Sequence, residues 1–335
     1  MTNLIAMTAA EASTLALREE FALDENVWAL GEDIGRGGVF GQYAGLQDEF
    51  GPQRVVDTPI SEAAILGVAV GAAMVGSRPV VEMRFSDFAL CAMDEMINQA
   101  AKARYMFGGQ SKVPIVVREP TGLWRSAAAQ HSQSLEAWYA HMPGLIVVCP
   151  STPADIRGLL KASIRADDPV VFMEPKGQWQ RTGEVDLDDQ EPYELGKAAG
   201  RREGDDVTIV SWSTQVHVAL EAAERLAEQS IESDVIDLRT IFPWDKDSVS
   251  QSVRRTGRLL VVHEAVAVGG FGGEIASWIS EHEFHHLKGP VARLGAPRIP
   301  VGYAPNLEDQ IRVTAENIVD RVIRMINEGE EETQV

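Results

Sequence analysis

The chain has 335 residues, 45% of them hydrophobic and 24% charged, which is the composition of a globular protein with room for two domains. Its formal net charge of −20 argues against binding to a nucleic-acid backbone, because that requires a basic face. The longest apolar run, residues 63–76, is shorter than the roughly 20 residues that cross a bilayer, so we expect no membrane insertion.

The first half of the chain alternates predicted helices and strands. A helix is predicted over residues 8–23, because Thr8 can cap it and Glu11 follows at the spacing of a capping box. A strand over Val27–Gly31 leads into a glycine-rich loop, and a strand at residues 55–56 leads through a turn into a helix that begins near Glu62. A later helix is predicted over residues 94–107. Short continuous apolar runs, typical of strands buried on both faces of a parallel sheet, occur at residues 80–81, 115–117, 145–148 and 170–172. The pattern predicts a doubly wound α/β domain.

The alternation lapses over residues 176–202, which we interpret as a linker, and then resumes. Strands are predicted at residues 207–211, 233–238, 259–264 and 291–294, and helices at 216–229, 273–282 and 307–326. We therefore expect two α/β domains, at residues 1–185 and 200–328. The acidic run over residues 329–335 is predicted to be a disordered tail.

Two cysteines, Cys91 and Cys149, lie far apart and form no CxxC or Cys/His cluster. This pattern favours a reducing compartment and argues against a zinc site. The first residues carry no basic region followed by an apolar core, so no secretory signal is predicted. We expect a cytoplasmic protein.

Glu62 stands at the predicted start of a helix that is built almost entirely of small apolar residues. Such a helix allows another backbone to approach closely. The helix macrodipole alone can explain an acidic residue at this position, and a functional carboxylate is the alternative.

His131 lies in a polar stretch of small residues, AlaAlaAlaGlnHisSerGlnSer. The flanking Gln130, Ser132 and Gln133 can orient an imidazole but bury it poorly, which suits proton transfer near neutral pH. A purely structural histidine is the alternative. His285 and His286 lack carboxylates at fixed helical spacing, so a solvated loop is favoured there over a metal site.

The glycine-rich segments carry no phosphate-binding signature. Neither residues 35–45 nor residues 269–274 match GxGxxG or a phosphate loop with its Lys-Ser/Thr pair. The chain also contains no GlyAspGly followed by an asparagine pair, the usual means of holding magnesium and a diphosphate. If a diphosphate cofactor is used, another chain must hold its phosphates.

Taken together, these pieces resemble the beta subunit of the thiamine-diphosphate-dependent component of 2-oxo acid dehydrogenase complexes. The resemblance extends over nearly the whole chain and rests on the order and spacing of many short segments. Its carriers are residues 31–33, 37–40, 57–62, 76–82, 87–88, 98–102, 131–133, 143–145, 168–170 and 237–241. It implies a transketolase-like pyrimidine-binding domain followed by a transketolase-type C-terminal domain.

The resemblance implies roles for individual residues. Glu62 matches the glutamate that hydrogen-bonds the aminopyrimidine of thiamine diphosphate, and Phe88 matches an aromatic residue that packs on that ring. His131 matches an active-site histidine that donates a proton as the acyl fragment passes to lipoamide. Arg84 stands near the cofactor, where it can pair with a substrate carboxylate or with Glu82 or Asp87.

The family also implies partners and ions. An alpha subunit would hold the diphosphate and Mg²⁺, and two alpha and two beta chains would form a heterotetramer that serves a lipoyl-bearing acyltransferase core. Some members hold a structural potassium ion at positions matching Ile115, Ser163, Ile164, Ala166 and Asp168.

The substrate stays open at this stage. Arg84 suggests a substrate carboxylate, whereas residues 104–109 and 147–151 look more like the acetoin-cleaving branch than the pyruvate branch. A split transketolase that transfers ketol units between sugar phosphates is an alternative, with Arg118 and Arg125 as phosphate ligands. A non-catalytic assembly subunit is a third interpretation.

Overall fold

The computed structural model describes residues 3–331, and the side chains of residues 3–327. The described chain divides into two compact units. The first contains the residues up to Trp124 together with Gln130–Leu195, and the second contains Arg125–Ala129 and the residues from Gly196 onward. No helix among the described residues is long and apolar enough to cross a membrane.

The first unit is built around a six-stranded parallel sheet with the order β6-β7-β5-β4-β2-β3. Alternate residues along the strands point to opposite faces, and every residue of β5 and β7 is buried, so these two central strands are covered on both sides. Its strands are β2 (Val27–Gly31), β3 (Val55–Asp57), β4 (Arg78–Glu82), β5 (Val116–Thr121), β6 (Ile146–Val148) and β7 (Val170–Pro175).

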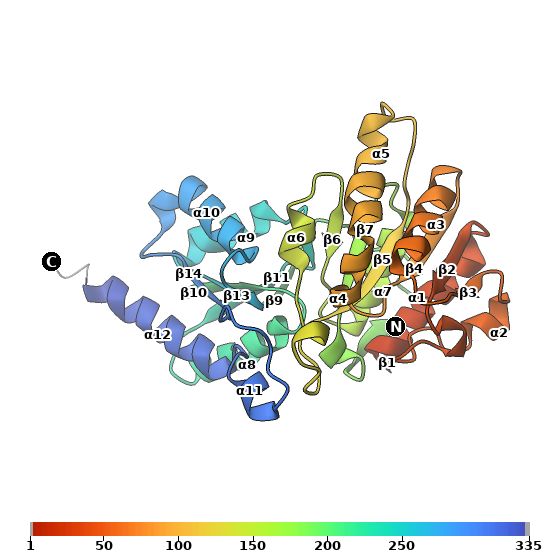
Figure 1. Ribbon diagram of the computed structural model, residues 1–335. Helices are drawn as coiled ribbons and strands as arrows, with labels where there is room; N and C mark the ends of the chain where they lie inside the picture. The colour runs from red at the N-terminus through yellow and green to blue at the C-terminus, as the bar shows by residue number, and fades with distance from the viewer. Residues whose placement is uncertain (1–2, 332–335) are drawn as a thin grey trace. The chain divides into compact units, whose positions relative to one another are not determined.

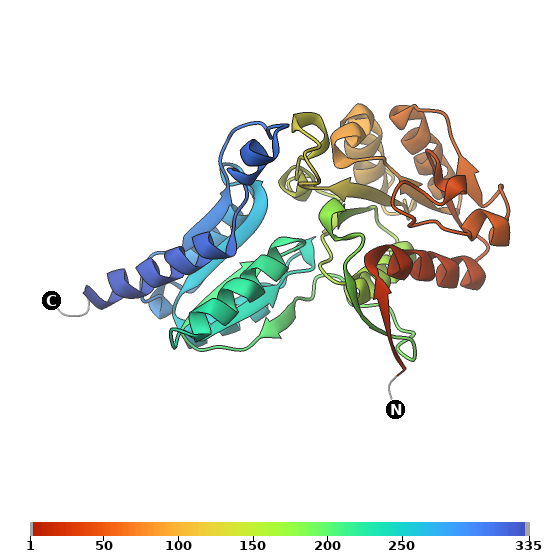
Figure 2. The same ribbon diagram turned by 90° about the horizontal axis from the view of Figure 1, so that it is seen from below.

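Helices cover both faces of this sheet (Figures 1 and 2). α1 (Ala9–Leu23) and α7 (Pro153–Arg165) pack together on one face, where Leu17, Phe21 and Leu160 join the main core cluster. α3 (Glu62–Met74) and α5 (Ala101–Met106) lie on the other. The remaining short helices are α2 (Leu46–Phe50), α4 (Ser86–Ala89) and α6 (Glu136–Ala140).

Several predicted elements of the first unit are confirmed. α1 starts after Thr8 with the full capping box, in which Glu11 N–H donates to Thr8 Oγ1 at 3.2 Å and Thr8 N–H donates to Glu11 Oε2 at 2.7 Å. The strand at Val27–Gly31 has the predicted bounds, and α3 begins at Glu62. The helix predicted over residues 94–107 has a π-helical first part, Glu95–Ala100, before α5.

The linker predicted over residues 176–202 is wrong in part. β8 (Thr182–Asp186) lies within it and pairs antiparallel with β1 (Leu4–Thr8), from Leu4 opposite Asp186 to Thr8 opposite Thr182. β9 (Ala199–Arg202) also lies within it and belongs to the second sheet. The apolar pattern was weak here because Val185 is the one buried residue among the five of β8.

The second unit contains a five-stranded sheet with the order β14-β13-β10-β11-β9, parallel except for β9 at its edge. α8 and α12 share a core cluster with one face, whereas Thr208 on the other face bonds Ser252 and Thr256 of α9. The elements are β10 (Val207–Ser211), α8 (Gln215–Ala227), β11 (Ser233–Asp237), β12 (Thr240–Phe242), α9 (Lys246–Thr256), β13 (Leu259–Val266), α10 (Gly272–His282), β14 (Ala292–Ala296), α11 (Pro305–Asp309) and α12 (Ala315–Glu331).

Three expectations for the second unit need correction. α9 was not predicted, because only Val249 and Val253 give its polar sequence an apolar face. The closing helix predicted over residues 307–326 is two helices, α11 and α12. α12 continues to Glu331 and so includes the start of the predicted disordered tail, whose remaining residues 332–335 lie outside the described chain.

Candidate active site

The candidate site residues follow the carboxyl ends of four neighbouring parallel strands. Glu32 and Asp33 come after β2, Glu62 after β3, residues 84–88 after β4, and His131 after β5. These strands are adjacent in the order β5-β4-β2-β3. In open α/β sheets this edge is where ligands bind. The topology therefore gathers residues that lie up to about a hundred positions apart in sequence.

Glu62 is the first residue of α3 and is half-buried. The preceding residue, Ser61, occupies the N-cap position, but its side chain makes no capping hydrogen bond. No described residue donates a hydrogen bond to the Glu62 carboxylate. A carboxylate that is half-buried and not used by its own helix end is available to a ligand.

A second carboxylate, Glu32, lies close enough to interact electrostatically with Glu62. Burial raises the pKa of Glu32, and the negative charge of Glu62 raises it further, while Arg84 lowers it. Two like charges that share a partly desolvated site favour keeping a proton on one of them. Glu32 was not predicted as a site residue, although it directly follows a strand in the quoted GlyGluAsp segment.

Arg84 pairs with Asp33, and not with either acidic residue considered from the sequence. This ion pair lowers the pKa of Asp33. Glu82 instead accepts hydrogen bonds from Tyr43 at 3.0 Å and Gln42 at 3.1 Å. The expectation that Glu82 or Asp87 would pair with Arg84 is therefore wrong. The partner could not be found from sequence spacing, because Asp33 precedes Arg84 by 51 positions.

The structure brings Phe88 and His131 together. Their ring centroids lie 5.1 Å apart at 84°, and Phe85 makes a second edge contact with His131 at 5.5 Å. Further rings extend this apolar wall, because Phe40 lies 6.4 Å from Phe85 and stacks on Trp179 at 5.3 Å. The imidazole therefore has a mainly aromatic surrounding, whereas the sequence had suggested a polar one.

The loop that carries His131 is held to α4 by hydrogen bonds. Gln133 donates from its backbone N–H and from Nε2 to Asp87 Oδ1, at 3.3 and 2.9 Å. Its carbonyl oxygen accepts from Ser86 at 3.2 Å and Thr121 at 3.1 Å. Gln133 thus fixes the loop to its support and does not orient the imidazole, as its position in the sequence had suggested.

Lys176 supports the same loop from the position directly after β7. Its ammonium group donates to the carbonyl oxygen of His131 and lies 4.6 Å from the ring centroid of Phe85. The lysine is only 1% exposed. A buried ammonium needs such partners to compensate for the water that it loses.

A buried charged network lies within the first unit, centred on Arg118. This fully buried guanidinium binds both carboxylate oxygens of Glu174, at 2.9 and 2.7 Å, and lies 3.7 Å from Glu82. Arg118 was considered as a ligand for a sugar phosphate. Its burial and its bidentate pairing exclude that role in this structure.

The residues predicted to hold potassium lie near one another, but a guanidinium binds two of them. Arg78 Nη1 donates to the carbonyl oxygens of Ile164 and Ala166 at 3.0 and 2.9 Å. Asp168 pairs with Arg104 at 2.7 Å. The carbonyl oxygen of Ile115 accepts from Val170 N–H at 2.9 Å, and that of Ser163 accepts from Ala166 N–H at 3.3 Å. Arg78 therefore places its positive charge at two of the five predicted ligands, and the other three are bound by other groups.

The site thus forms two connected groups. Glu32 interacts electrostatically with Glu62 and with Arg84, and Phe88 interacts with His131. Residues 84–88 join the groups, because Arg84 belongs to the first and Phe85 and Phe88 to the second. No contact between Glu62 and His131 occurs among the described residues.

Comparison with known proteins assigns each unit to a domain family. Two family models match the chain, "Transketolase, pyrimidine binding domain" over residues 5–181 and "Transketolase, C-terminal domain" over residues 196–318. A solved structure described as split gene transketolase, inactive beta4 tetramer, has a TM-score of 0.78 over 96% of this chain and 98% of its own, at 24% identity. That likeness establishes the fold alone.

Relatives with higher identity cover almost the whole chain. The 2-oxoisovalerate dehydrogenase subunit beta of Bacillus subtilis is 46% identical over 93% of this chain and 96% of its own length. The acetoin:2,6-dichlorophenolindophenol oxidoreductase subunit beta of the same organism is 43% identical over 98% and 99%. The pyruvate dehydrogenase E1 component subunit beta-2 of Oryza sativa subsp. japonica is 44% identical over 93% and 84%. The chain belongs to the family of beta subunits of 2-oxo acid and acetoin dehydrogenases, built from the two transketolase domains.

Proposed function

We propose that this chain is the beta subunit of a thiamine-diphosphate-dependent dehydrogenase for a 2-oxo acid of the pyruvate type or for acetoin. The observation that carries the proposal is the position of the Glu62 carboxylate. It is half-buried at the start of α3, and it lies at the edge of the sheet where ligands bind. The match to a pyrimidine-binding domain over residues 5–181 supports it.

The described residues fit a bound aminopyrimidine. Glu62 offers an acceptor that its own helix does not use, and Glu32 nearby has a pKa that is already raised. Phe88 adds an apolar ring on the same edge of the sheet. When bound, thiamine diphosphate supplies a nucleophilic carbon and an electron sink for cleavage next to a carbonyl group.

Four residues of this chain have distinct roles in the proposed function. A carboxylate oxygen of Glu62 would share a proton with a ring nitrogen of the bound pyrimidine, and exclusion of water would strengthen that hydrogen bond. Phe88 packs against the ring. The imidazole of His131 donates a proton as the acyl group passes to lipoamide. Arg84 positions Glu32 and Asp33 by its charge, since it is paired with Asp33.

An alpha subunit completes the proposed site. The sequence carries no diphosphate signature, so the alpha subunit would hold the diphosphate and Mg²⁺. α3 presents Gly67, Val68, Gly71 and Met74 as exposed residues, which suits close approach by another chain. We propose an assembly of two alpha and two beta chains that serves a lipoyl-bearing acyltransferase core. A cytoplasmic location stays a prediction based on the number and spacing of the two cysteines in the sequence.

Potassium binding also stays a proposal. The carbonyl oxygens of Ile164 and Ala166 converge as such a site requires, but the charge of Arg78 opposes a second cation beside them. Thermal unfolding in KCl and in choline chloride of equal ionic strength tests the point. A higher Tm in KCl supports potassium, and equal Tm values show that the guanidinium is sufficient.

The decisive experiment for the function is substitution of Glu62→Gln in the chain co-purified with its alpha subunit. Turnover is measured with thiamine diphosphate and a dye acceptor on pyruvate, branched 2-oxo acids and acetoin. We expect E62Q to abolish turnover on the accepted substrate while the mass of the assembly stays the same. Glu95→Gln is the matched control, because Glu95 is also half-buried and lies beside Gly67 of α3.

Two results would contradict the proposal. If the unaltered complex turns over none of these substrates, the assigned activity is wrong. If E62Q retains activity, another group performs the proton sharing, or the chain only supports assembly. A requirement for a phosphorylated aldehyde acceptor would indicate ketol transfer, which the burial of Arg118 and the named relatives do not support.

A further inference from the structure

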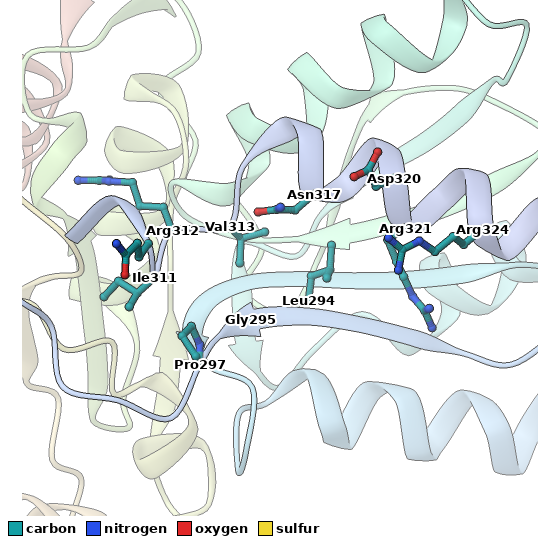
Figure 3. Close-up of a pocket in the computed structure, with 11 residues that line it drawn as sticks. Leu294, Gly295, Pro297, Ile311, Arg312, Val313, Asn317, Asp320, Arg321 and Arg324 are labelled. Carbon is teal, nitrogen blue, oxygen red and sulfur yellow. The ribbon is translucent and has the colours of Figure 1, made fainter. Parts of the chain in front are cut away.

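The second unit contains a pocket that the proposed function does not use. It has a volume of about 310 Å³ and lies between the end of β14, the segment that precedes α12, and one side of α12 (Figure 3). Pockets that bind small molecules usually have volumes of about 300 Å³ or more. All of the lining residues belong to this unit.

Two arginines give the pocket a positive charge. Arg321 and Arg324 both line it and stand three positions apart on α12, which places them on the same helix face. No described residue forms an ion pair with either one. By contrast Arg312, at the other end of the pocket, pairs with Glu308 and with Asp309.

The remaining charge in the pocket does not neutralise the pair. Among the described residues, Asp320 is the one acidic side chain in the lining, and no ion pair joins it to Arg321 or Arg324. Asn317 Oδ1 accepts from the Thr314 N–H at 3.0 Å, which leaves the amide NH₂ of Asn317 as a further donor. In a chain with a net charge of −20, this pocket is a local concentration of hydrogen-bond donors.

Much of the remaining lining is apolar, although Gln310 and Arg312 also contribute to it. Leu294, Pro297, Ile311 and Val313 contribute carbon surface next to the arginines. A site with convergent charged donors at one end and apolar surface at the other is typical of sites for small organic anions. Arginines that are only solvated on a helix surface would not need a pocket of this kind beside them.

We propose that this pocket binds a small organic phosphate. A phosphate dianion carries the charge that matches two guanidinium groups, and its oxygens suit their forked donors. One arginine would satisfy a carboxylate, whereas two arginines and an amide donor match three phosphate oxygens. The apolar surface of Leu294 and Ile311 receives the organic part.

Calorimetric titration of the full-length chain at fixed ionic strength in KCl tests the proposal, with inorganic phosphate and phenyl phosphate as probes. We expect phenyl phosphate to bind more tightly than inorganic phosphate, because its ring covers the apolar surface. Replacement of both arginines, Arg321→Gln and Arg324→Gln, should weaken phenyl phosphate binding by about tenfold or more, since charge-assisted hydrogen bonds are lost. Arg225→Gln is the control, because Arg225 is exposed on α8 and pairs with Glu221.

Circular dichroism establishes whether the double variant is folded. Asp320→Asn gives an independent measure, because removal of the acidic side chain of Asp320 from the lining should tighten phosphate binding. Equal affinity of the unaltered chain and a folded double variant would overturn the proposal. So would an Asp320→Asn variant whose affinity is unchanged, or equal affinity for the two probes.

Discussion

The ring of Phe88 meets the ring of His131 edge to face, with centroids 5.1 Å apart at 84°. Such pairs are favourable because the positive edge of one ring faces the negative face of the other. The contact joins two segments that follow neighbouring strands, α4 after β4 and the histidine loop after β5. The orientation of the imidazole therefore depends on the position of α4.

Asp87 is the residue that holds α4 and this loop together, and it is 8% exposed. Replacement of Asp87→Ala removes both hydrogen bonds from Gln133 to Asp87 Oδ1. We expect kcat of the assembled enzyme to fall by about ten- to a hundredfold, because each charge-assisted bond contributes about 1.5–3 kcal/mol. Steady-state assays with the dye acceptor measure this fall.

The matched control is Asp94→Ala. Asp94 is exposed and bonds Asn98 of its own helical stretch at 2.7 Å. We expect that variant to keep its activity. A folded D87A variant with unchanged kcat would show that the loop position does not depend on Asp87.

Arg118 offers a test of the buried charged network. Replacement of Arg118→Met leaves Glu174 buried without its bidentate partner and removes the positive charge next to Glu82. Loss of one partner of a buried ion pair costs about 3–5 kcal/mol. We therefore expect the free energy of unfolding of the first unit to fall by that amount in denaturant titrations.

Arg18→Met is the comparison for this prediction. Its ion pair with Glu49 is exposed on both sides, with 40% and 46% of the side-chain surfaces accessible. Exposed pairs contribute between 0 and about 1 kcal/mol. If R118M were no more destabilised than R18M, the network would be dispensable for stability.

Local signals were sufficient for much of the fold. The capping box at Thr8 and Glu11 located the start of α1, and continuous apolar runs located most of the parallel strands of the two sheets, because these features depend on nearby residues only. The start of α3 at Glu62 followed from the turn before it. The roles of Glu62, Phe88 and His131 came from the family resemblance, and they stay predictions.

Long-range contacts were beyond the reach of the sequence. The pairing of β1 with β8 joins Leu4 to Asp186 and has no local signature. The ion pair of Arg84 with Asp33 and the hydrogen bond of Arg78 to Ala166 span 51 and 88 positions. Glu32 could have been predicted as a site residue from the sequence, because it directly follows β2 and ligands bind at the carboxyl ends of parallel strands.

The exposed side of α3 supports a prediction about assembly. A Cβ atom added at Gly71 meets nothing within 4 Å in this chain. Glycine costs about 1 kcal/mol relative to alanine in a helix, so Gly71→Leu should leave the isolated chain at least as stable in thermal unfolding. In the proposed assembly the added side chain would separate two closely packed backbones, and the mass of the complex should fall.

Glu224→Leu is the control for Gly71→Leu. Glu224 is exposed on α8 of the second unit, so the substitution adds a similar apolar side chain at a different surface. We expect its complex with the alpha subunit to have the normal mass. A G71L complex of normal mass would exclude this face of α3 from the interface.

His263 gives the second unit a pH-dependent stability. The ring is fully buried, stacks on Trp212 at 5.3 Å, and has Nδ1 3.0 Å from the carbonyl oxygen of Ala265. Three glycines lie so close that a Cβ atom at Gly270, Gly272 or Gly295 would come within 2.6–2.8 Å of the ring. Burial lowers the pKa of His263 from 6.5 to about 4.

The sign of the effect follows from proton binding. Between pH 4 and 6.5 the unfolded chain binds a proton at position 263 that the folded chain does not bind, so stability rises with pH across this window. The stabilisation is fully present above pH 6.5, is lost as pH falls toward 4, and amounts to roughly 3 kcal/mol at most.

His263→Phe should remove this dependence, because phenylalanine does not titrate. The added ring atom lowers stability equally at every pH, so the slope of Tm against pH is the quantity to compare. His285→Gln, at an exposed position, should keep the slope of the unaltered chain. An equal slope in H263F would show that other groups cause the loss of stability in acid.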